Sequence, residues 1–168
     1  MAKGSGGTPA TTALQSAGID FVVHEYSLAE GVLPGRGGET TYGEAVAAYL
    51  QVEPERVYKT LVAASDGHLV VGVVPVVTTL DLKALATAVG HKKAELANVA
   101  VAERTTGYVI GGISPFGQRK QLTTVVDETV ELFDTVFVSA GKRGLQLEVA
   151  PADLISATAA IVWPLARQ

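Results

Sequence analysis

Hydrophobic residues recur along the chain in two patterns, and the first of these predicts β-strands. Residues 19–23 are hydrophobic at every second position, as in a half-buried strand. Residues 57–64 and 69–74 are largely apolar and flank an Asp-Gly dipeptide at positions 66–67, a typical hairpin turn. Further strands are predicted at residues 108–110, 123–126, 135–138 and 145–149.

The second pattern has helical spacing and is marked by residues that begin and end helices. Leu82, Leu85, Ala86 and Val89 share one face of a predicted helix that ends at Gly90. Elsewhere, N-capping residues or helix-starting prolines precede the apolar positions. We therefore expect helices to begin at Thr8 followed by Pro9, at Thr41 with Glu44 as a capping box, at Thr79, after Asn98 and at Pro151.

The order of these elements favours a mixed sheet over a purely parallel one. Hairpins are interspersed with helices, whereas a parallel sheet needs a crossover between successive strands. We expect an α/β fold of the α+β kind. It would be a single compact domain with a bent, mostly antiparallel, barrel-like sheet and peripheral helices.

The length and composition fit one globular domain. The chain has 168 residues, of which 48% are hydrophobic and 18% charged, and this excludes global disorder. Residues 1–7 (MAKGSGG) are rich in glycine and serine, so we expect a flexible start or a remnant of cloning. The domain is expected to span residues 8–168, with a glycine-rich loop at residues 31–38 (GVLPGRGG).

Several function classes are excluded or disfavoured. The chain has no cysteine, which excludes disulfides, cysteine nucleophiles and thiolate metal sites. A net charge of −4 disfavours bulk electrostatic binding to nucleic acid, although a local basic patch can still bind it. The longest apolar run contains Gly72 and Pro75 and is shorter than the about 20 residues of a membrane span. With no signal-peptide pattern, we expect a cytoplasmic protein without a membrane partner.

The sequence contains no recognisable metal motif. His24, His68 and His91 are too far apart in sequence to form a metal-binding motif, and we expect them to be surface or structural residues. We therefore expect no metal and no other cofactor.

Two glycine-containing segments and one lysine are candidates for chemistry. Residues 141–144 (GKRG) fail as a phosphate loop, so they form either a tight turn with solvated cations or a phosphate contact through Lys142 and Arg143. Gly111 and Gly112 would let a ligand approach backbone N–H groups, although a simple loop corner is equally compatible. Lys59 lies in an apolar strand and either lines a wet cavity or extends outward from a sheet edge.

Five segments together resemble the YbaK/EbsC family. These single-domain aminoacyl-tRNA deacylases are related to the editing domain of bacterial prolyl-tRNA synthetase. The resemblance runs from about Thr8 to the C-terminal helix. Within the family, the chain is most similar to the branch that deacylates Cys-tRNA(Pro). The segments are residues 57–61 (VYKTL), 80–83 (LDLK), 104–108 (RTTGY), 111–115 (GGISP) and 139–144 (SAGKRG).

The resemblance implies a mechanism without an enzyme nucleophile, in which the substrate thiol attacks its own ester carbonyl and leaves as a thiolactone. It implies that Lys59 contacts the terminal adenosine or the ester, that Tyr26 lies at the pocket, and that the backbone of Gly111 approaches the aminoacyl group. Gly112 and Ser114 would complete that wall. From their charge, Lys142 and Arg143 are expected to bind acceptor-stem phosphates.

The expected partners are aminoacyl-tRNA, through the acceptor end of tRNA(Pro), and prolyl-tRNA synthetase. Two alternatives remain open. One is a binding module that holds aminoacyl-tRNA, nucleotide or a synthetase without turnover. The other is an editor of a different ester, such as Ala-tRNA(Pro). The stretch between Tyr26 and the Thr41 capping box, which contains the loop at residues 31–38, is longer than usual for the family and leaves the amino-acid specificity open.

Overall fold

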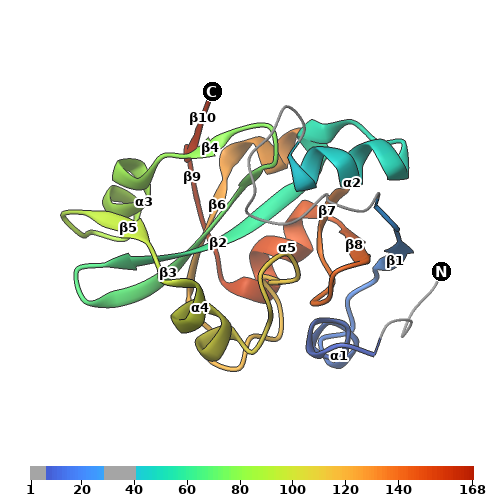
Figure 1. Cartoon of the computed structure of the whole chain (residues 1–168), viewed down its shortest axis with the longest axis horizontal. Coiled ribbons are helices and arrows are strands. Elements are labelled where there is room, and N and C mark those ends of the chain that lie inside the picture. Colours follow the sequence, from blue (N-terminus) through green and yellow to red (C-terminus); the bar gives the residue numbers. More distant parts are fainter. Residues whose placement is uncertain (1–6, 29–40) are drawn as a thin grey trace.

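The computed structural model describes residues 7–28 and 41–168 (Figure 1). The predicted loop at residues 31–38 and residues 1–6 of the predicted flexible start lie outside the described residues. None of the helices in the two described ranges has the length and apolar content needed to cross a membrane.

The β2–β3 hairpin is the centre of the larger sheet. Its strands pair antiparallel along their whole length, with Tyr58 opposite Pro75. Asp66 and Gly67 have φ values of 47° and 82°, the left-handed pair that a tight hairpin turn requires. β6 pairs in parallel with β3, and β9 in parallel with β6, so the sheet is mixed. In sheet order the strands are β5 (Ala94–Leu96), β2 (Tyr58–Ser65), β3 (His68–Pro75), β6 (Thr123–Asp127) and β9 (Ile161–Trp163).

A smaller antiparallel sheet lies beside the start of β2. A parallel bridge between Val57 and Phe137 joins the two sheets at this point. The described strands form open sheets of five, three and two strands rather than a closed barrel, and the predicted α+β class is confirmed. The smaller sheets contain β1 (Val22–Glu25), β8 (Leu145–Val149) and β7 (Val136–Ser139), and β10 (Ala166–Arg167) with β4 (Thr79–Leu80).

The helices lie around these sheets, as predicted (Figure 1). The predicted caps are present, because the hydroxyl of Thr8 accepts a hydrogen bond from the Thr11 N–H and that of Thr41 from the Glu44 N–H, both at 3.2 Å. The α-helices are α1 (Pro9–Ser16), α2 (Tyr42–Leu50), α3 (Leu82–Ala88), α4 (Val99–Thr106) and α5 (Pro151–Thr158). Two 3-10 helices, η1 (Pro54–Arg56) and η2 (Glu128–Leu132), complete the set in the described ranges.

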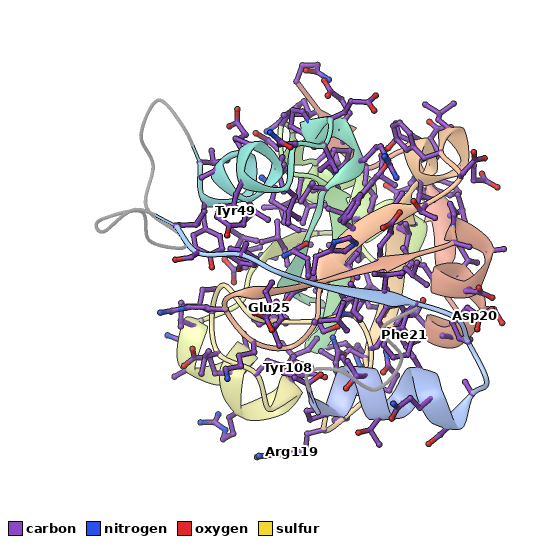
Figure 2. All side chains as sticks on the ribbon, turned by 90° about the vertical axis from the view of Figure 1, so that its right-hand side faces the viewer. Asp20, Phe21, Glu25, Tyr49, Tyr108 and Arg119 are labelled. Atoms are coloured by element: carbon purple, nitrogen blue, oxygen red, sulfur yellow. The ribbon has the colours of Figure 1, made fainter. Side chains whose placement is uncertain are left out.

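Three predicted elements differ from the structure. The helix expected from Thr79 begins at Leu82, because the side chain of Asp81 caps it and Thr79 pairs with β10 instead. Residues 108–110 form a loop rather than a strand. The first strand begins at Val22, although Phe21 is buried and Asp20 exposed as the alternation predicts (Figure 2).

The space around the start of β2 is closed by three elements. A cluster of buried residues, Ala47, Val57, Val76 and Phe137, packs α2 against the end of β3 and against β7. Burial of such apolar side chains stabilises the arrangement by roughly 25 cal/mol per Å². As a result, Lys59 of β2 lines the same space as residues of α2.

Candidate active site

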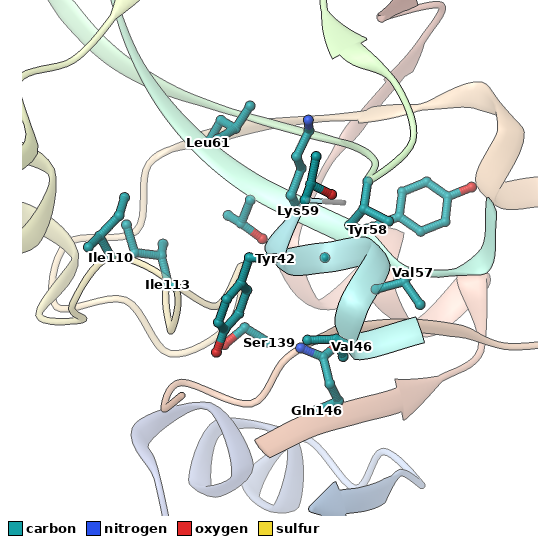
Figure 3. A pocket seen from close by; sticks show the side chains of 15 residues that line it. Tyr42, Val46, Val57, Tyr58, Lys59, Leu61, Ile110, Ile113, Ser139 and Gln146 are labelled. Carbon is teal, nitrogen blue, oxygen red and sulfur yellow. The ribbon is translucent and has the colours of Figure 1, made fainter. Parts of the chain in front are cut away.

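A cavity of about 330 Å³ lies between α2, the first half of β2 and the loop that contains Gly111 (Figure 3). Its walls are largely apolar, with Val46, Val57, Val76 and Ile113 among them. A mostly apolar cavity with a few placed polar groups is the usual form of a small-ligand site. The residues with polar side chains that line it are Thr41, Tyr42, Tyr58, Lys59, Thr60, Ser139 and Gln146.

Lys59 is half-buried and lines this cavity, so the structure supports the first of the two interpretations of this lysine. Its Nζ donates a hydrogen bond to the carbonyl oxygen of Thr78 at 2.7 Å. Burial lowers the pKa of the Lys59 ammonium below its usual value, and the Glu44 carboxylate partly opposes this shift. The strand thus supplies a hydrogen-bonded amine with spare donors at one end of the cavity.

The opposite end of the cavity carries neutral polar groups. Figure 3 shows Tyr42, Ser139 and Gln146 together at this end, away from Lys59. Ser139 and Gln146 are cross-strand neighbours on β7 and β8, which explains why both face the cavity. Among the described residues that line it, this end therefore offers hydroxyl and amide groups but no carboxylate.

Two polar atoms of residues that line the cavity have no hydrogen-bond partner among the described residues. They are the Oγ1 of Thr60 and the Oε1 of Gln146, and both are fully shielded from solvent. A buried acceptor without a partner costs about 1–3 kcal/mol. Such a cost is commonly tolerated where a ligand supplies the missing donor.

The hydroxyl of Tyr42 is held by a second tyrosine behind the cavity wall. The Oη atoms of Tyr26 and Tyr42 are 2.6 Å apart, and their rings meet edge to face. Burial and the hydrogen bond with Tyr26 raise the pKa of Tyr42 well above its usual value, while the charge of Arg143 opposes the shift. The Tyr42 hydroxyl therefore stays protonated at neutral pH.

Gly111 forms part of the opposite wall through its backbone. Its φ of 84° lies in the left-handed region, which glycine adopts without strain. The Gly112 N–H closes a turn onto the carbonyl oxygen of Val109 at 2.8 Å. In contrast, no described residue accepts a hydrogen bond from the N–H of Gly111.

Comparisons with known proteins agree with this fold. Residues 38–157 match the family described as "Aminoacyl-tRNA editing domain". The chain belongs to this family. The match covers the strand with Lys59, the loop with Gly111 and the cross-strand pair of Ser139 and Gln146.

Three similar proteins illustrate the relationship of this editing domain. "Putative Cys-tRNA(Pro)/Cys-tRNA(Cys) deacylase EbsC" of Enterococcus faecalis is 45% identical over 116 residues, covering 68% of this chain and 71% of that protein. "Proline--tRNA ligase" of Desulforamulus reducens is 28% identical over 136 residues, or 81% of this chain and 23% of the ligase. A solved structure described as "a putative trans-editing enzyme for prolyl tRNA synthetase" has a TM-score of 0.80 at 22% identity. It covers 95% of this chain and 96% of that one, and supports the fold.

Of the remaining predicted site residues, Tyr26, Gly112 and Ser114 lie behind the cavity wall of the editing domain. Tyr26 is buried and reaches the cavity through Tyr42. Ser114 is fully buried, and its Oγ accepts a hydrogen bond from the Phe116 N–H at 3.3 Å. Gly112 and Ser114 therefore do not line the cavity, contrary to the prediction for this segment.

The two basic residues of the turn between β7 and β8, Lys142 and Arg143, differ in their contacts with the cavity wall. Both Lys142 and Arg143 are exposed and lie outside the cavity lining. The Nε of Arg143 donates a hydrogen bond to the carbonyl oxygen of Ile110 at 2.8 Å. Arg143 is thus bound to the cavity wall, a role that its charge alone did not indicate.

The histidines have local partners, as expected for structural residues. His24 Nε2 lies 2.8 Å from the Glu148 carboxylate, and His91 Nδ1 lies 2.9 Å from the hydroxyl of Ser65. The ring of His68 stacks on that of His91, with ring centroids 5.4 Å apart. In the described ranges, no group of three or more His, Cys, Asp or Glu residues is placed to hold a metal ion.

The sequence did not single out four residues that line the cavity: Tyr42, Thr60, Ser139 and Gln146. Tyr42 is the first residue of a predicted helix, Ser139 directly follows a predicted strand, and Gln146 is the second residue of another. Their types are common on surfaces. The alternation of β2 did indicate that Lys59 and Leu61 share a face, and both line the cavity.

Proposed function

We propose that this editing domain is a trans-editing hydrolase that deacylates mischarged Cys-tRNA(Pro). The observation that carries the proposal is that one cavity is lined by both Lys59 and the backbone of Gly111. In the reaction, the substrate thiol sulfur attacks the ester carbonyl and forms a C–S bond. The ester C–O bond breaks, the thiol proton ends on the tRNA hydroxyl, and a cysteine thiolactone is released.

Each cavity group has a role in this proposal. The Lys59 ammonium binds the terminal adenosine or the ester region, because it is a donor at one end of the cavity. The Gly111 N–H polarises the ester carbonyl and stabilises the negative charge that develops on its oxygen. The Gln146 side chain, which lines the end of the cavity away from Lys59, positions the cysteinyl group. Catalysis then rests on positioning and electrostatic stabilisation.

The partners follow from the same activity. The net charge of −4 predicts weak, salt-sensitive binding of free tRNA, because few phosphates are neutralised. We therefore propose that prolyl-tRNA synthetase is the partner that recognises tRNA(Pro). Part of one such enzyme, the ligase of Desulforamulus reducens, is 28% identical to this chain. This activity places the protein in the cytoplasm.

A deacylation assay on Cys-, Ala- and Pro-tRNA(Pro) in the presence of a chelator tests the proposal. We expect rapid loss of cysteine alone by the wild type and a loss of at least 100-fold in rate for Lys59→Ala. Lys83→Ala is the matched control, since Lys83 lies exposed on α3 and does not line the cavity. Hydrolysis of the alanyl ester instead would overturn the thiol-assisted mechanism. No turnover of any ester would favour the binding-module alternative.

A further inference from the structure

Charged side chains hold both backbone polar groups of Ile110, a residue of the cavity wall. The carboxylate of Glu103 accepts a hydrogen bond from the Ile110 N–H at 2.8 Å. The Nε of Arg143 donates to the Ile110 carbonyl oxygen, also at 2.8 Å. Glu103 lies on α4 and Arg143 in the turn between β7 and β8, so two separate elements fix one residue of the wall.

The carbonyl of Ile110 and the N–H of Gly111 belong to the same peptide group. The described peptide bonds include no cis bond, so this N–H points away from the carbonyl and hence away from Arg143. Gly111 lines the cavity, whereas Arg143 does not. The N–H of Gly111, for which no described residue is an acceptor, is thus held in a direction away from Arg143, on a residue that lines the cavity.

A charged donor on the carbonyl also strengthens this N–H. Hydrogen bonds from a guanidinium are stronger than neutral ones, and linked hydrogen bonds polarise each other. The Arg143 hydrogen bond draws electron density toward the Ile110 oxygen, which makes the Gly111 N–H more positive. Arg143 therefore affects both the direction and the strength of the donor.

Close packing fixes the turn of Arg143 against the same wall. A Cβ atom placed on Gly112 would lie 3.0 Å from the backbone N of Arg143 and 3.0 Å from the Cα of Lys142. Only glycine allows the two backbone segments to approach this closely. The position of the Arg143 backbone is therefore set relative to Gly111.

We propose that Arg143 is a positioning residue that orients and strengthens the Gly111 N–H, with Glu103 as the second anchor of the wall. The proposal rests on the proposed function, in which this N–H polarises the ester carbonyl. The proposed role of Arg143 differs from the phosphate contact expected from its charge. Loss of a phosphate contact would weaken tRNA binding and leave the cavity wall unchanged.

The first test observes Gly111 directly, by NMR of the full ¹⁵N-labelled chain. Loss of a hydrogen bond on a carbonyl moves the ¹⁵N resonance of the following amide upfield. We expect such a shift for Gly111 in Arg143→Met and no comparable shift in the neighbouring variant Lys142→Met. A Gly111 resonance that stays in place in Arg143→Met overturns the proposal, whatever the enzymatic activity.

The second test distinguishes an effect of Arg143 on the cavity wall from an effect on the binding of tRNA phosphates. It compares Cys-tRNA(Pro) with 3′-O-cysteinyl adenosine, a substrate without phosphate. We expect Arg143→Met to lower kcat about 10-fold on both, less than the 100-fold or more that loss of an oxyanion donor costs. Lys83→Met, on α3, should leave kcat unchanged on both substrates. A normal kcat on the adenosine ester with a raised KM for tRNA overturns the proposal in favour of a phosphate contact.

Glu103 supplies an independent arm of the test. Glu103→Ala removes the acceptor of the Ile110 N–H and should lower kcat on the adenosine ester. Glu103→Gln keeps an oxygen acceptor and should restore most of that loss. Equal losses in both variants would overturn the anchoring role of Glu103. If the wild type cleaves neither ester, the proposed function fails, and the Gly111 resonance still decides whether Arg143 holds the wall.

Discussion

The Oη atoms of Tyr26 and Tyr42 lie 2.6 Å apart and join the end of β1 to the first turn of α2. Tyr42 lines the cavity and Tyr26 supports it from behind. The predicted role of Tyr26 at the pocket is therefore that of a supporting residue, which reaches the cavity through another side chain.

This pair predicts a shared contribution to stability. Tyr26→Phe and Tyr42→Phe each remove the same hydrogen bond, so each should lower the free energy of unfolding by about 1 kcal/mol. The double variant should lose less than the sum of the two, as measured by denaturant unfolding in a double-mutant cycle. Tyr49→Phe, at an exposed tyrosine of α2, is the control and should be neutral. Additive losses would show that the two hydroxyls do not depend on each other.

Lys59 is expected to cost stability while it supports activity. Burial lowers the pKa of its ammonium, so the unfolded chain binds more protons than the folded one between that lowered pKa and about pH 10.4. The Lys59 contribution to stability therefore rises as the pH rises through this window. Lys59→Met has no such dependence and should be the more stable variant at neutral pH.

The measurement compares urea unfolding of the wild type and Lys59→Met between about pH 7 and about pH 10. The stability advantage of the variant should shrink as the pH rises. Both proteins contain the same tyrosines, so the difference between them removes the contribution of tyrosine titration to the pH dependence. These tyrosines include Tyr58, whose pKa burial raises to about 12. An advantage that is constant with pH, or a less stable variant at neutral pH, would contradict this account.

Gln146, like Lys59, is expected to lower the stability of the fold while it supports activity. Its buried Oε1 has no partner among the described residues, so Gln146→Met should raise the free energy of unfolding by about 1 kcal/mol. The same variant should lower kcat/KM for the cysteinyl ester. Gln118→Met is the matched control, because the equally buried Gln118 amide donates to Ser114 and accepts from Leu122, and its loss should destabilise. Equal destabilisation by both variants would mean that Gln146 is satisfied in solution.

Gly43 sets how closely α2 approaches the cavity. A Cβ at this position would lie 2.3 Å from Cγ1 of Val76, so Gly43→Ala must displace α2 or the end of β3. We expect a loss of about 1–3 kcal/mol in unfolding free energy and a lower deacylation rate. Val76→Gly in the same chain should recover part of both losses, because it removes both methyl groups and the Cβ atom, which would lie 2.6 Å from the new Cβ. Failure of this rescue would place the effect of Gly43 elsewhere.

Much of the fold follows from local sequence chemistry. The Asp66-Gly67 turn, the Thr8 and Thr41 caps and the start of α5 at Pro151 lie where the sequence predicted them. Each depends on residues within about four positions of one another, and such short-range preferences are visible in a sequence. Residues 108–110 show the limit, because their apolar content is equally compatible with a strand and with a buried loop.

The site divides in the same way. The alternation of β2 indicated that Lys59 shares a face with Leu61, and the glycine-containing segment indicated a backbone wall, of which Gly111 is part and Gly112 is not. By contrast, Ser114 faces away from the cavity because its hydroxyl binds the Phe116 N–H in a local turn. The direction of a loop side chain depends on such contacts, which no periodicity encodes.

By itself, the sequence determined the α+β class, the main hairpin, most helix boundaries and the family to which the chain belongs. Only the tertiary structure decided which polar groups share the cavity. Tyr42, Ser139 and Gln146 come from α2, β7 and β8, and the contact between Arg143 and Ile110 spans 33 positions. Contacts of this kind depend on how sheets and helices pack, because the position of each element is set by burial of apolar faces over the whole domain.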